Sequence, residues 1–212
     1  MPLKEFKNYN EYWESRSSLP LLYRFKYVAN DLPNIGRVLD VGCGDGTFLK
    51  YLKTKKPDLT IMGLDISPVS IKRLKEAEIL GFVHDVSANE LPRSIKADYV
   101  VIMEVLEHFE NPEFVLKSLL STGATRYYVT IPNLGYIEHR LRLAIAGKMP
   151  ITSIILHIRE HLRFWTVSDF RHWADQMGFN VLAVKGQRGV PGFWRVFPSV
   201  FASQVIYTLE IK

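Results

Sequence analysis

The sequence lacks the features that mark several classes of protein. Its single cysteine, Cys43, cannot form an internal disulfide or build a cysteine-rich zinc site. No apolar run reaches the roughly 18 residues that span a bilayer, and residues 1–5 lack the charged-then-apolar layout of a secretory signal. We therefore expect a cytoplasmic protein without a membrane partner.

Repeats, low-complexity tracts and polar linkers are also absent from the sequence. Its 212 residues, 47% of them hydrophobic and 23% charged, have the composition of an ordinary globular protein. At roughly 150 residues per domain, this length allows one core with a cap or an insertion, but not a second independent domain.

Basic residues outnumber acidic ones by 27 to 22, which gives a formal net charge of +5. This balance suits an anionic partner such as a phosphate, a carboxylate or RNA. The excess gathers in residues 139–163, which hold one acidic residue, Glu160. Such a stretch either recognises an anionic group or forms a solvated face. Its basic and imidazole side chains are Arg140, Arg142, Lys148, Arg159, Arg163, His139, His157 and His161.

Short apolar runs alternate with segments of helical spacing along the chain. Strands are expected at residues 37–41, 60–65, 81–83, 97–103, 126–131, 180–185 and 203–211. Cap residues and prolines place helix starts between them, at Thr47, Pro68, Pro112 and Val167.

Seven strands with interleaved helices predict an α/β fold, namely a doubly wound, Rossmann-like, mainly parallel sheet with helices on both faces. We expect residues 1–34 to form a helical cap and residues 35–212 to form the domain. The segment at about 133–165 interrupts the alternation, so it is expected to be an inserted lid.

A glycine-rich turn follows the first predicted strand and runs from Asp40 to Gly46. Its three glycines stand at alternate positions, unlike the Gly-x-Gly-x-x-Gly fingerprint of dinucleotide-binding proteins. They let the backbone approach a ligand closely. Because Asp40 would repel a pyrophosphate, the turn favours a cationic or zwitterionic nucleoside.

Asp65 ends the second predicted strand, about twenty residues after Gly46. An acidic residue at that point of such folds binds the hydroxyls of a ribose. The glycine turn and this carboxylate together are a far more specific signal than either alone.

Three segments, residues 38–46, 63–67 and 104–108, resemble those of class I S-adenosylmethionine-dependent methyltransferases. The resemblance covers residues 35–212 and implies the fold, the cofactor and its product, S-adenosylhomocysteine. It implies that the methionine moiety lies on the turn, the ribose on Asp65, and the adenine beside Ile66 and Asp85. A loop cap is the alternative role for Asp85. The implied cofactor-binding residues are Asp40, Gly42, Cys43, Gly44, Gly46, Asp65, Ile66, Asp85, Val86 and Glu104.

The sulfonium of that cofactor makes its methyl group electrophilic, so the reaction needs mainly positioning of the acceptor and loss of a proton. Glu104, Glu107 and His108 follow the fourth predicted strand, and their spacing places them on one face of a helical turn. We expect His108 and Glu107 to be the catalytic residues. A structural histidine is the alternative.

In ubiquinone-pathway O-methyltransferases and small-RNA 2′-O-methyltransferases, which this segment resembles, a Glu-x-x-Glu-His set binds a divalent metal. The corresponding ligands would be Glu104, Glu107 and His108, a set suited to Mg²⁺ or Mn²⁺. Many methyltransferases use the Glu-His pair without a metal, and we expect no metal here.

Further residues are candidates for contact with the acceptor. Tyr12 and Trp13 stand in an aromatic segment that either contacts the ligand or only packs, and the inserted lid adds Asn133, Arg140 and Arg163.

The lid also resembles MetW-type proteins of methionine biosynthesis, through residues 130–135, Arg140, residues 147–150, His161 and Thr166. That resemblance implies a non-enzymatic alternative, in which the chain is the partner of a homoserine acetyltransferase. We expect instead a monomeric or homodimeric enzyme that methylates a small anionic or hydroxylated acceptor. RNA methylation is the other alternative, although the sequence shows no appended RNA-binding module.

Overall fold

The computed structural model describes residues 8–16, 19–148 and 161–212. These residues divide into two compact units. The N-terminal unit comprises residues 8–16, 19–103 and 111–128, and the C-terminal unit comprises residues 104–110, 129–148 and 161–212. Seven strands are hydrogen-bonded in the order β3-β2-β1-β4-β5-β7-β6, which confirms the predicted doubly wound sheet.

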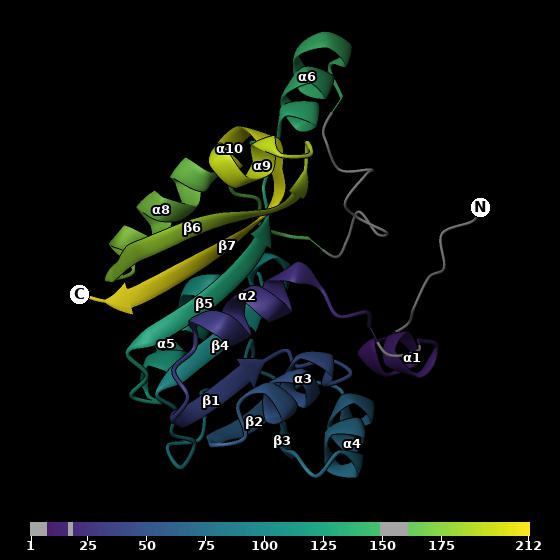
Figure 1. Ribbon diagram of the computed structural model, residues 1–212, viewed down its shortest axis with the longest axis vertical. Helices are drawn as coiled ribbons and strands as arrows, with labels where there is room; N and C mark the ends of the chain where they lie inside the picture. The colour runs from purple at the N-terminus through teal and green to yellow at the C-terminus, as the bar shows by residue number, and fades with distance from the viewer. Residues whose placement is uncertain (1–7, 17–18, 149–160) are drawn as a thin grey trace. The chain divides into compact units, whose positions relative to one another are not determined.

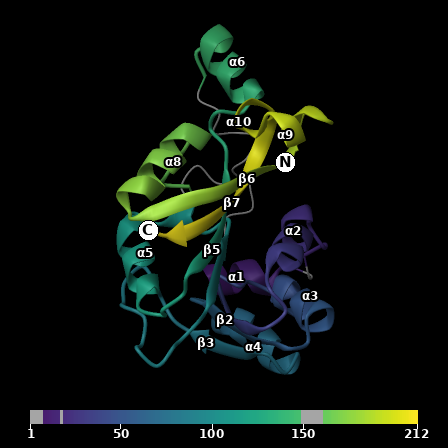
Figure 2. The ribbon, with the colours of Figure 1, turned by 60° about the vertical axis from the view of Figure 1, so that its left-hand side comes forward.

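The N-terminal unit is built on parallel strands, in which β1 pairs with both β2 and β4, and β2 pairs with β3. Two views show α2, α3 and α4 on one face of these strands and α5 on the other (Figures 1 and 2). The strands are β1 (Gly36–Val41), β2 (Leu59–Asp65), β3 (Leu80–Val83) and β4 (Tyr99–Met103). The helices are α1 (Tyr9–Glu14), α2 (Tyr23–Asp31), α3 (Thr47–Lys55), α4 (Pro68–Glu76) and α5 (Pro112–Leu120).

Local sequence explains these elements. The β1 residues Val38, Leu39 and Val41 are buried, as expected for a strand covered on both faces. Ser67 accepts a hydrogen bond from the Ser70 N–H and so caps α4, which begins with a proline.

The register of β1 and β2 positions the candidate site. Asp40 lies beside Gly63 and Val41 beside Leu64, so the two strands end at the same edge of the sheet. Gly63 allows this close packing, because a Cβ there would lie 2.4 Å from Leu74 Cδ1 and 2.8 Å from Cys43 Sγ. The glycine turn and Asp65 are therefore neighbours.

The C-terminal unit contains the antiparallel pair of β6 (Phe179–Gly189) and β7 (Ala202–Ile211). Strand β5 (Arg126–Pro132) begins in the N-terminal unit and ends in this one. Phe170 packs on Tyr207 with their ring centroids 4.1 Å apart, and the predicted capping box of Thr166 and Asp169 is present. The helices are the 3₁₀ turn η1 (Leu106–His108), α6 (Ile137–Ala146), α8 (Val167–Gln176), α9 (Phe193–Val196) and α10 (Pro198–Phe201).

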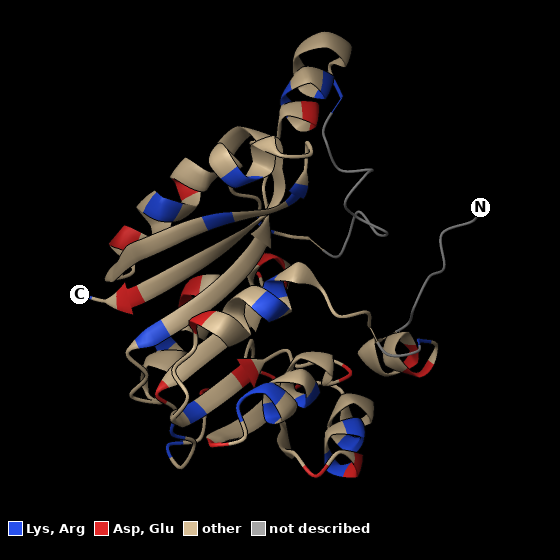
Figure 3. Ribbon diagram, in the orientation of Figure 1, with Lys and Arg blue, Asp and Glu red and all other residues tan. Residues whose placement is uncertain are grey.

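All seven predicted strands are present, and so are the four predicted helices between them. Three features were missed: β6 continues to Gly189 rather than ending at residue 185, α9 and α10 occupy residues 193–201, and the segment expected as a lid contains helix α6. The expected basic stretch is only partly visible, because Arg159 and His157 lie outside the described residues. Its helical part, α6, carries both signs of charge (Figure 3). Across the described ranges, no helix is long and apolar enough to cross a membrane.

Candidate active site

The glycine turn connects β1 to α3 and is fixed to the end of β2 by its own backbone. The N–H groups of Gly42 and Cys43 donate to the Leu64 carbonyl at 2.7 and 3.1 Å. Gly44 has a φ of +55°, and a Cβ there would lie 2.5 Å from the Trp13 ring. Only glycine satisfies both the backbone conformation and the space at this position.

Helix α1 therefore lies against the turn, with Trp13 over Gly44. The Arg73 side chain of α4 donates to the carbonyl oxygens of Trp13 and Arg16 at 2.7 and 3.0 Å. Tyr12 packs edge-on against Trp13, with ring centroids 5.0 Å apart. Packing on the turn is thus established for Trp13, and contact of either ring with a ligand stays a prediction.

Asp65 binds the turn directly. One carboxylate oxygen accepts the Gly44 N–H at 2.9 Å, and the other accepts the Ser67 N–H at 2.8 Å. The side chain is only 7% exposed. Because each carboxylate oxygen has two lone pairs, Asp65 keeps acceptor capacity for a ligand.

Negative charge accumulates beneath the turn. The pKa of Asp40 is raised well above its usual value by burial, and further by the charges of Asp65 and Asp45, against a smaller opposing effect of Arg24. Burial also raises the pKa of Asp65. Asp45 belongs to the local structure, since it accepts hydrogen bonds from the Thr47 N–H at 3.0 Å and the Thr47 hydroxyl at 2.7 Å. A cationic ligand would relieve this repulsion.

Cys43 is buried in the turn, and its thiol pKa is raised well above the usual value by burial and by Asp40. The thiol therefore stays protonated at neutral pH and is not a nucleophile. Its N–H, which bonds to Leu64, helps to shape the turn instead.

The predicted adenine-binding residues lie beyond β2 and β3. Ile66 is 45% exposed, whereas Val86 is buried. Asp85 accepts hydrogen bonds from the Ser87 N–H at 2.9 Å and the Ser87 hydroxyl at 2.6 Å. Asp85 is thus a loop cap, and its contact with an adenine stays a prediction.

In the C-terminal unit, Glu104 departs from the predicted helical face. Its φ of +59° places it in the left-handed region, before η1 begins. Its two carboxylate oxygens accept hydrogen bonds from the Thr130 hydroxyl at 3.0 Å and from Gln204 Nε2 at 2.6 Å. These bonds engage both carboxylate oxygens, and the cluster of potential metal ligands found among the described residues does not include Glu104.

Glu107 and His108 lie instead beside His161, and one potential ligand atom from each residue lies within 4.8 Å of the other two. The backbone holds this cluster together, because the N–H groups of Leu162 and Arg163 donate to the Glu107 carbonyl at 2.8 and 3.1 Å. Glu107 is 1% exposed. Burial, with a smaller effect of His108, lowers the pKa of His161 to about 4. His161 was not among the predicted site residues.

The predicted acceptor-binding residues of the lid bond to the chain itself. Asn133 donates to the carbonyls of Pro198, Ser199 and Ala202, and accepts the Gly135 N–H at 2.8 Å. Arg140 Nε donates to the Gly135 carbonyl at 2.5 Å, and Arg163 donates to the Glu110 carbonyl. These contacts give all three residues structural roles.

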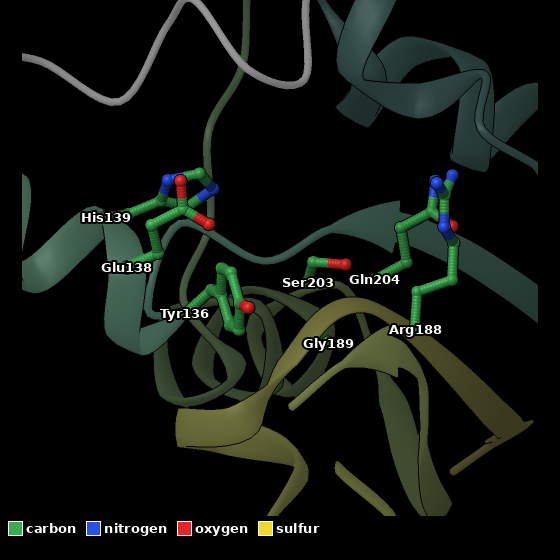
Figure 4. A pocket seen from close by; sticks show the side chains of 7 residues that line it. All are labelled: Tyr136, Glu138, His139, Arg188, Gly189, Ser203 and Gln204. Carbon is green, nitrogen blue, oxygen red and sulfur yellow. The ribbon is translucent and has the colours of Figure 1, made fainter. Parts of the chain in front are cut away.

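A different set of side chains lines a pocket of about 520 Å³ in the C-terminal unit (Figure 4). Its residues come from α6, β6, β7 and the residue before α6. Two of them could hardly be found from the sequence, because His139 is only one of several residues of the basic stretch and Arg188 lies beyond the predicted end of its strand. The lining residues are Tyr136, Glu138, His139, Arg188, Gly189, Ser203 and Gln204.

Comparison with known proteins adds a family and a fold. Residues 23–209 match the family model described as methionine biosynthesis protein MetW. The chain is also 28% identical over 203 residues to a ubiquinone biosynthesis O-methyltransferase of Xanthomonas euvesicatoria pv. vesicatoria (strain 85-10), which covers 88% of this chain and 82% of that protein.

Two solved structures illustrate the fold. A SAM-dependent methyltransferase of Thermotoga maritima, described as a possible histamine N-methyltransferase, has a TM-score of 0.64 at 16% identity over 89% of this chain and 88% of that chain. An S-adenosylmethionine-dependent methyltransferase of Mesorhizobium loti has a TM-score of 0.62 at 14% identity over 88% and 97% of the chains.

The buried charge of Asp40 predicts a pH-dependent stability. A carboxyl group whose pKa is raised by folding destabilises the protein above its unfolded-state pKa, so stability falls as pH rises through the shifted range. In the absence of ligand, we expect Asp40→Asn to raise the melting temperature at pH 8, and the gain to shrink toward pH 5. Thermal unfolding monitored by circular dichroism measures this. Asp58→Asn, at an exposed carboxylate, is the control. An equal gain in melting temperature for Asp40→Asn at both pH values would contradict the raised pKa of Asp40.

Proposed function

This chain belongs to the MetW family, within the class I S-adenosylmethionine-dependent methyltransferases, and we propose that it methylates a small anionic or hydroxylated acceptor. The observation that carries the proposal is the bond between Asp65 and the Gly44 N–H, which joins an acidic strand end to the glycine turn. That arrangement places carboxylate oxygens, which can accept hydrogen bonds from a ligand, and negative charge at the same edge of the sheet.

The residues of the turn fit S-adenosylmethionine. Its sulfonium and ammonium groups are cations, which suit the repelling carboxylates of Asp40 and Asp65. Asp65 retains lone pairs for ribose hydroxyls, and the exposed Ile66 offers an apolar surface for the adenine. A pyrophosphate would add negative charge to the same cluster, so a dinucleotide fits poorly.

Bound S-adenosylmethionine supplies an electrophilic methyl group. The chain's own residues then have to hold the cofactor, orient the acceptor and remove a proton from it. We assign the binding role to Asp40, Asp65 and the turn backbone, and the proton-accepting role to His108, which Glu107 positions. Catalysis of this kind requires no covalent intermediate.

The cluster of Glu107, His108 and His161 also fits a divalent cation, because one potential ligand atom from each residue lies within 4.8 Å of the other two. Two imidazoles and one carboxylate suit Mn²⁺, Fe²⁺, Co²⁺ or Zn²⁺ better than Ca²⁺. A cation held there would supply Lewis-acid activation of an acceptor hydroxyl. This role of His108 as a ligand is an alternative to its role as the proton acceptor, because a coordinated imidazole nitrogen has no lone pair left for a proton. The proposed set differs from that of the sequence analysis, since His161 replaces Glu104.

The family match favours a role in methionine biosynthesis. The second candidate is therefore the alternative of the sequence analysis, in which the chain is the partner of an acyltransferase. The two candidates differ in what they require of Asp65, because only methyl transfer needs the cofactor to bind. An RNA acceptor receives less support, because Arg140 and Arg163 are already bonded to backbone carbonyls.

Asp65→Ala tests the cofactor assignment. The substitution removes a charged acceptor from the ribose hydroxyls, so we expect binding of S-adenosylmethionine to weaken by about 1–3 kcal/mol, roughly 5- to 150-fold. Calorimetric titration measures the affinity, and a methylation assay with the isolated acceptor follows the activity. The control is Asp58→Ala, at an exposed carboxylate just before the same strand. Unchanged affinity in Asp65→Ala would remove Asp65 from the site.

His161→Ala tests the metal assignment. Losing one of three ligands should weaken Mn²⁺ or Co²⁺ binding by at least about tenfold, as measured by titration calorimetry and by the visible absorption of Co²⁺. His172→Ala, at an exposed histidine of α8, is the matched control. The metal site is refuted if the unmodified protein binds neither ion, or if His161→Ala binds them as tightly.

A further inference from the structure

The pocket of the C-terminal unit carries both signs of charge. Glu138 and Arg188 are its two charged lining residues, and Figure 4 shows Arg188 across the pocket from Glu138 and His139. The ion pairs found among the described residues involve neither Glu138 nor Arg188. Both charges are therefore available to a ligand.

His139 gives independent evidence that this pocket is built to be filled. Its side chain is 3% exposed, yet neither ring nitrogen has a hydrogen-bond partner within the described part of the chain. A buried polar group without a partner costs free energy, and folded proteins rarely leave one in place. Burial lowers the pKa of His139, so the neutral ring offers one donor and one acceptor to a ligand.

The backbone conformation of Arg188 is a second observation that favours a binding site at this pocket. Its φ of +55° lies in the left-handed region, which is unfavourable for a residue with a side chain. Such strain often marks a binding site, where it sets the direction of a side chain. The neighbouring residue must be a glycine, because a Cβ at Gly189 would lie 2.0 Å from the Phe201 carbonyl oxygen.

Side-chain hydrogen bonds hold one lining residue of the pocket, Gln204, in place. Gln204 accepts a hydrogen bond from Gln187 at 2.7 Å and donates to Glu104 at 2.6 Å. Its amide is therefore fixed rather than adaptable. Since Gln204 lines the pocket together with Arg188, the ligand meets a polar side chain whose orientation is already fixed.

We propose that this pocket binds a small zwitterion whose carboxylate pairs with Arg188 and whose ammonium pairs with Glu138, while His139 bonds to one of its polar groups. A simple anion would meet the charge of Glu138, and a simple cation would meet that of Arg188, so a ligand with both charges satisfies the pocket best. A volume of about 520 Å³ leaves room for a side chain. The inference rests on the proposed function and narrows its methyl acceptor to a zwitterion, whose carboxylate is the anionic group.

The experiment is a titration of the unmodified protein with free amino acids. The probes are the twenty common L-amino acids, together with β-alanine, 4-aminobutyrate and 6-aminohexanoate, which separate the two charges by increasing distances. We expect at least one probe to bind, and its N-acetyl and carboxamide derivatives, each lacking one charge, to bind at least about tenfold more weakly. The proposal is overturned if no probe binds, or if a derivative binds as well as its parent.

Two variants assign the charges. Arg188→Gln should weaken binding of the parent probe about tenfold or more and abolish its advantage over the carboxamide. Glu138→Gln should likewise abolish the advantage over the N-acetyl form. Lys185→Gln, at an exposed cation of the same strand outside the pocket, should bind like the unmodified protein. Equal probe affinities in all three variants would overturn the assignment.

The readout separates this inference from the proposed function, because probe binding requires no methyl transfer. S-Adenosylmethionine affinity is measured in the same samples and should be unchanged in Arg188→Gln. Probe binding without cofactor binding would contradict the methyltransferase proposal alone. Cofactor binding without probe binding would contradict the pocket assignment alone.

Discussion

The hydrogen bond from the Gly44 N–H to Asp65 is the constraint on which the N-terminal unit's chemistry depends. It exists because β1 and β2 end in register at one edge of the sheet, and because Gly44 accepts a left-handed backbone beneath the ring of Trp13. The bond brings a second carboxylate close to Asp40, and burial makes that proximity costly. A site with this electrostatic strain is prepared for a cation before any ligand arrives.

In the C-terminal unit, most of the polar side chains expected to bind a ligand are hydrogen-bonded to the chain itself. Asn133, Arg140 and Arg163 carry the chemistry that often recognises ligands, but each is bonded to backbone carbonyls and so organises the fold. Within the described residues, the buried ring of His139 has no hydrogen-bond partner, and the left-handed backbone of Arg188 has no comparable role in the fold. What a polar group already binds is therefore a better guide to function than its residue type.

The sequence was sufficient for the N-terminal unit because its signals are local. Apolar runs, Ser67-Pro68 and the alternating glycines predict the strands, the cap and the turn, and parallel pairing then brings Asp40 and Asp65 together. The cluster of Glu107, His108 and His161 in the C-terminal unit depends on contacts between segments that are distant in the sequence. Nothing near Glu107 indicates His161, which backbone bonds at Leu162 bring to it, and Glu104 leaves the predicted helical face through a left-handed φ that local spacing does not reveal.

We propose that the turn binds an adenosyl sulfonium rather than a phosphorylated coenzyme. The decisive measurement is a calorimetric titration of the unmodified protein with S-adenosylmethionine and, separately, with NADH. We expect saturable one-to-one binding of S-adenosylmethionine and no heat of binding from NADH, whose phosphates would face Asp40 and Asp65. Binding of NADH with no response to S-adenosylmethionine would contradict it.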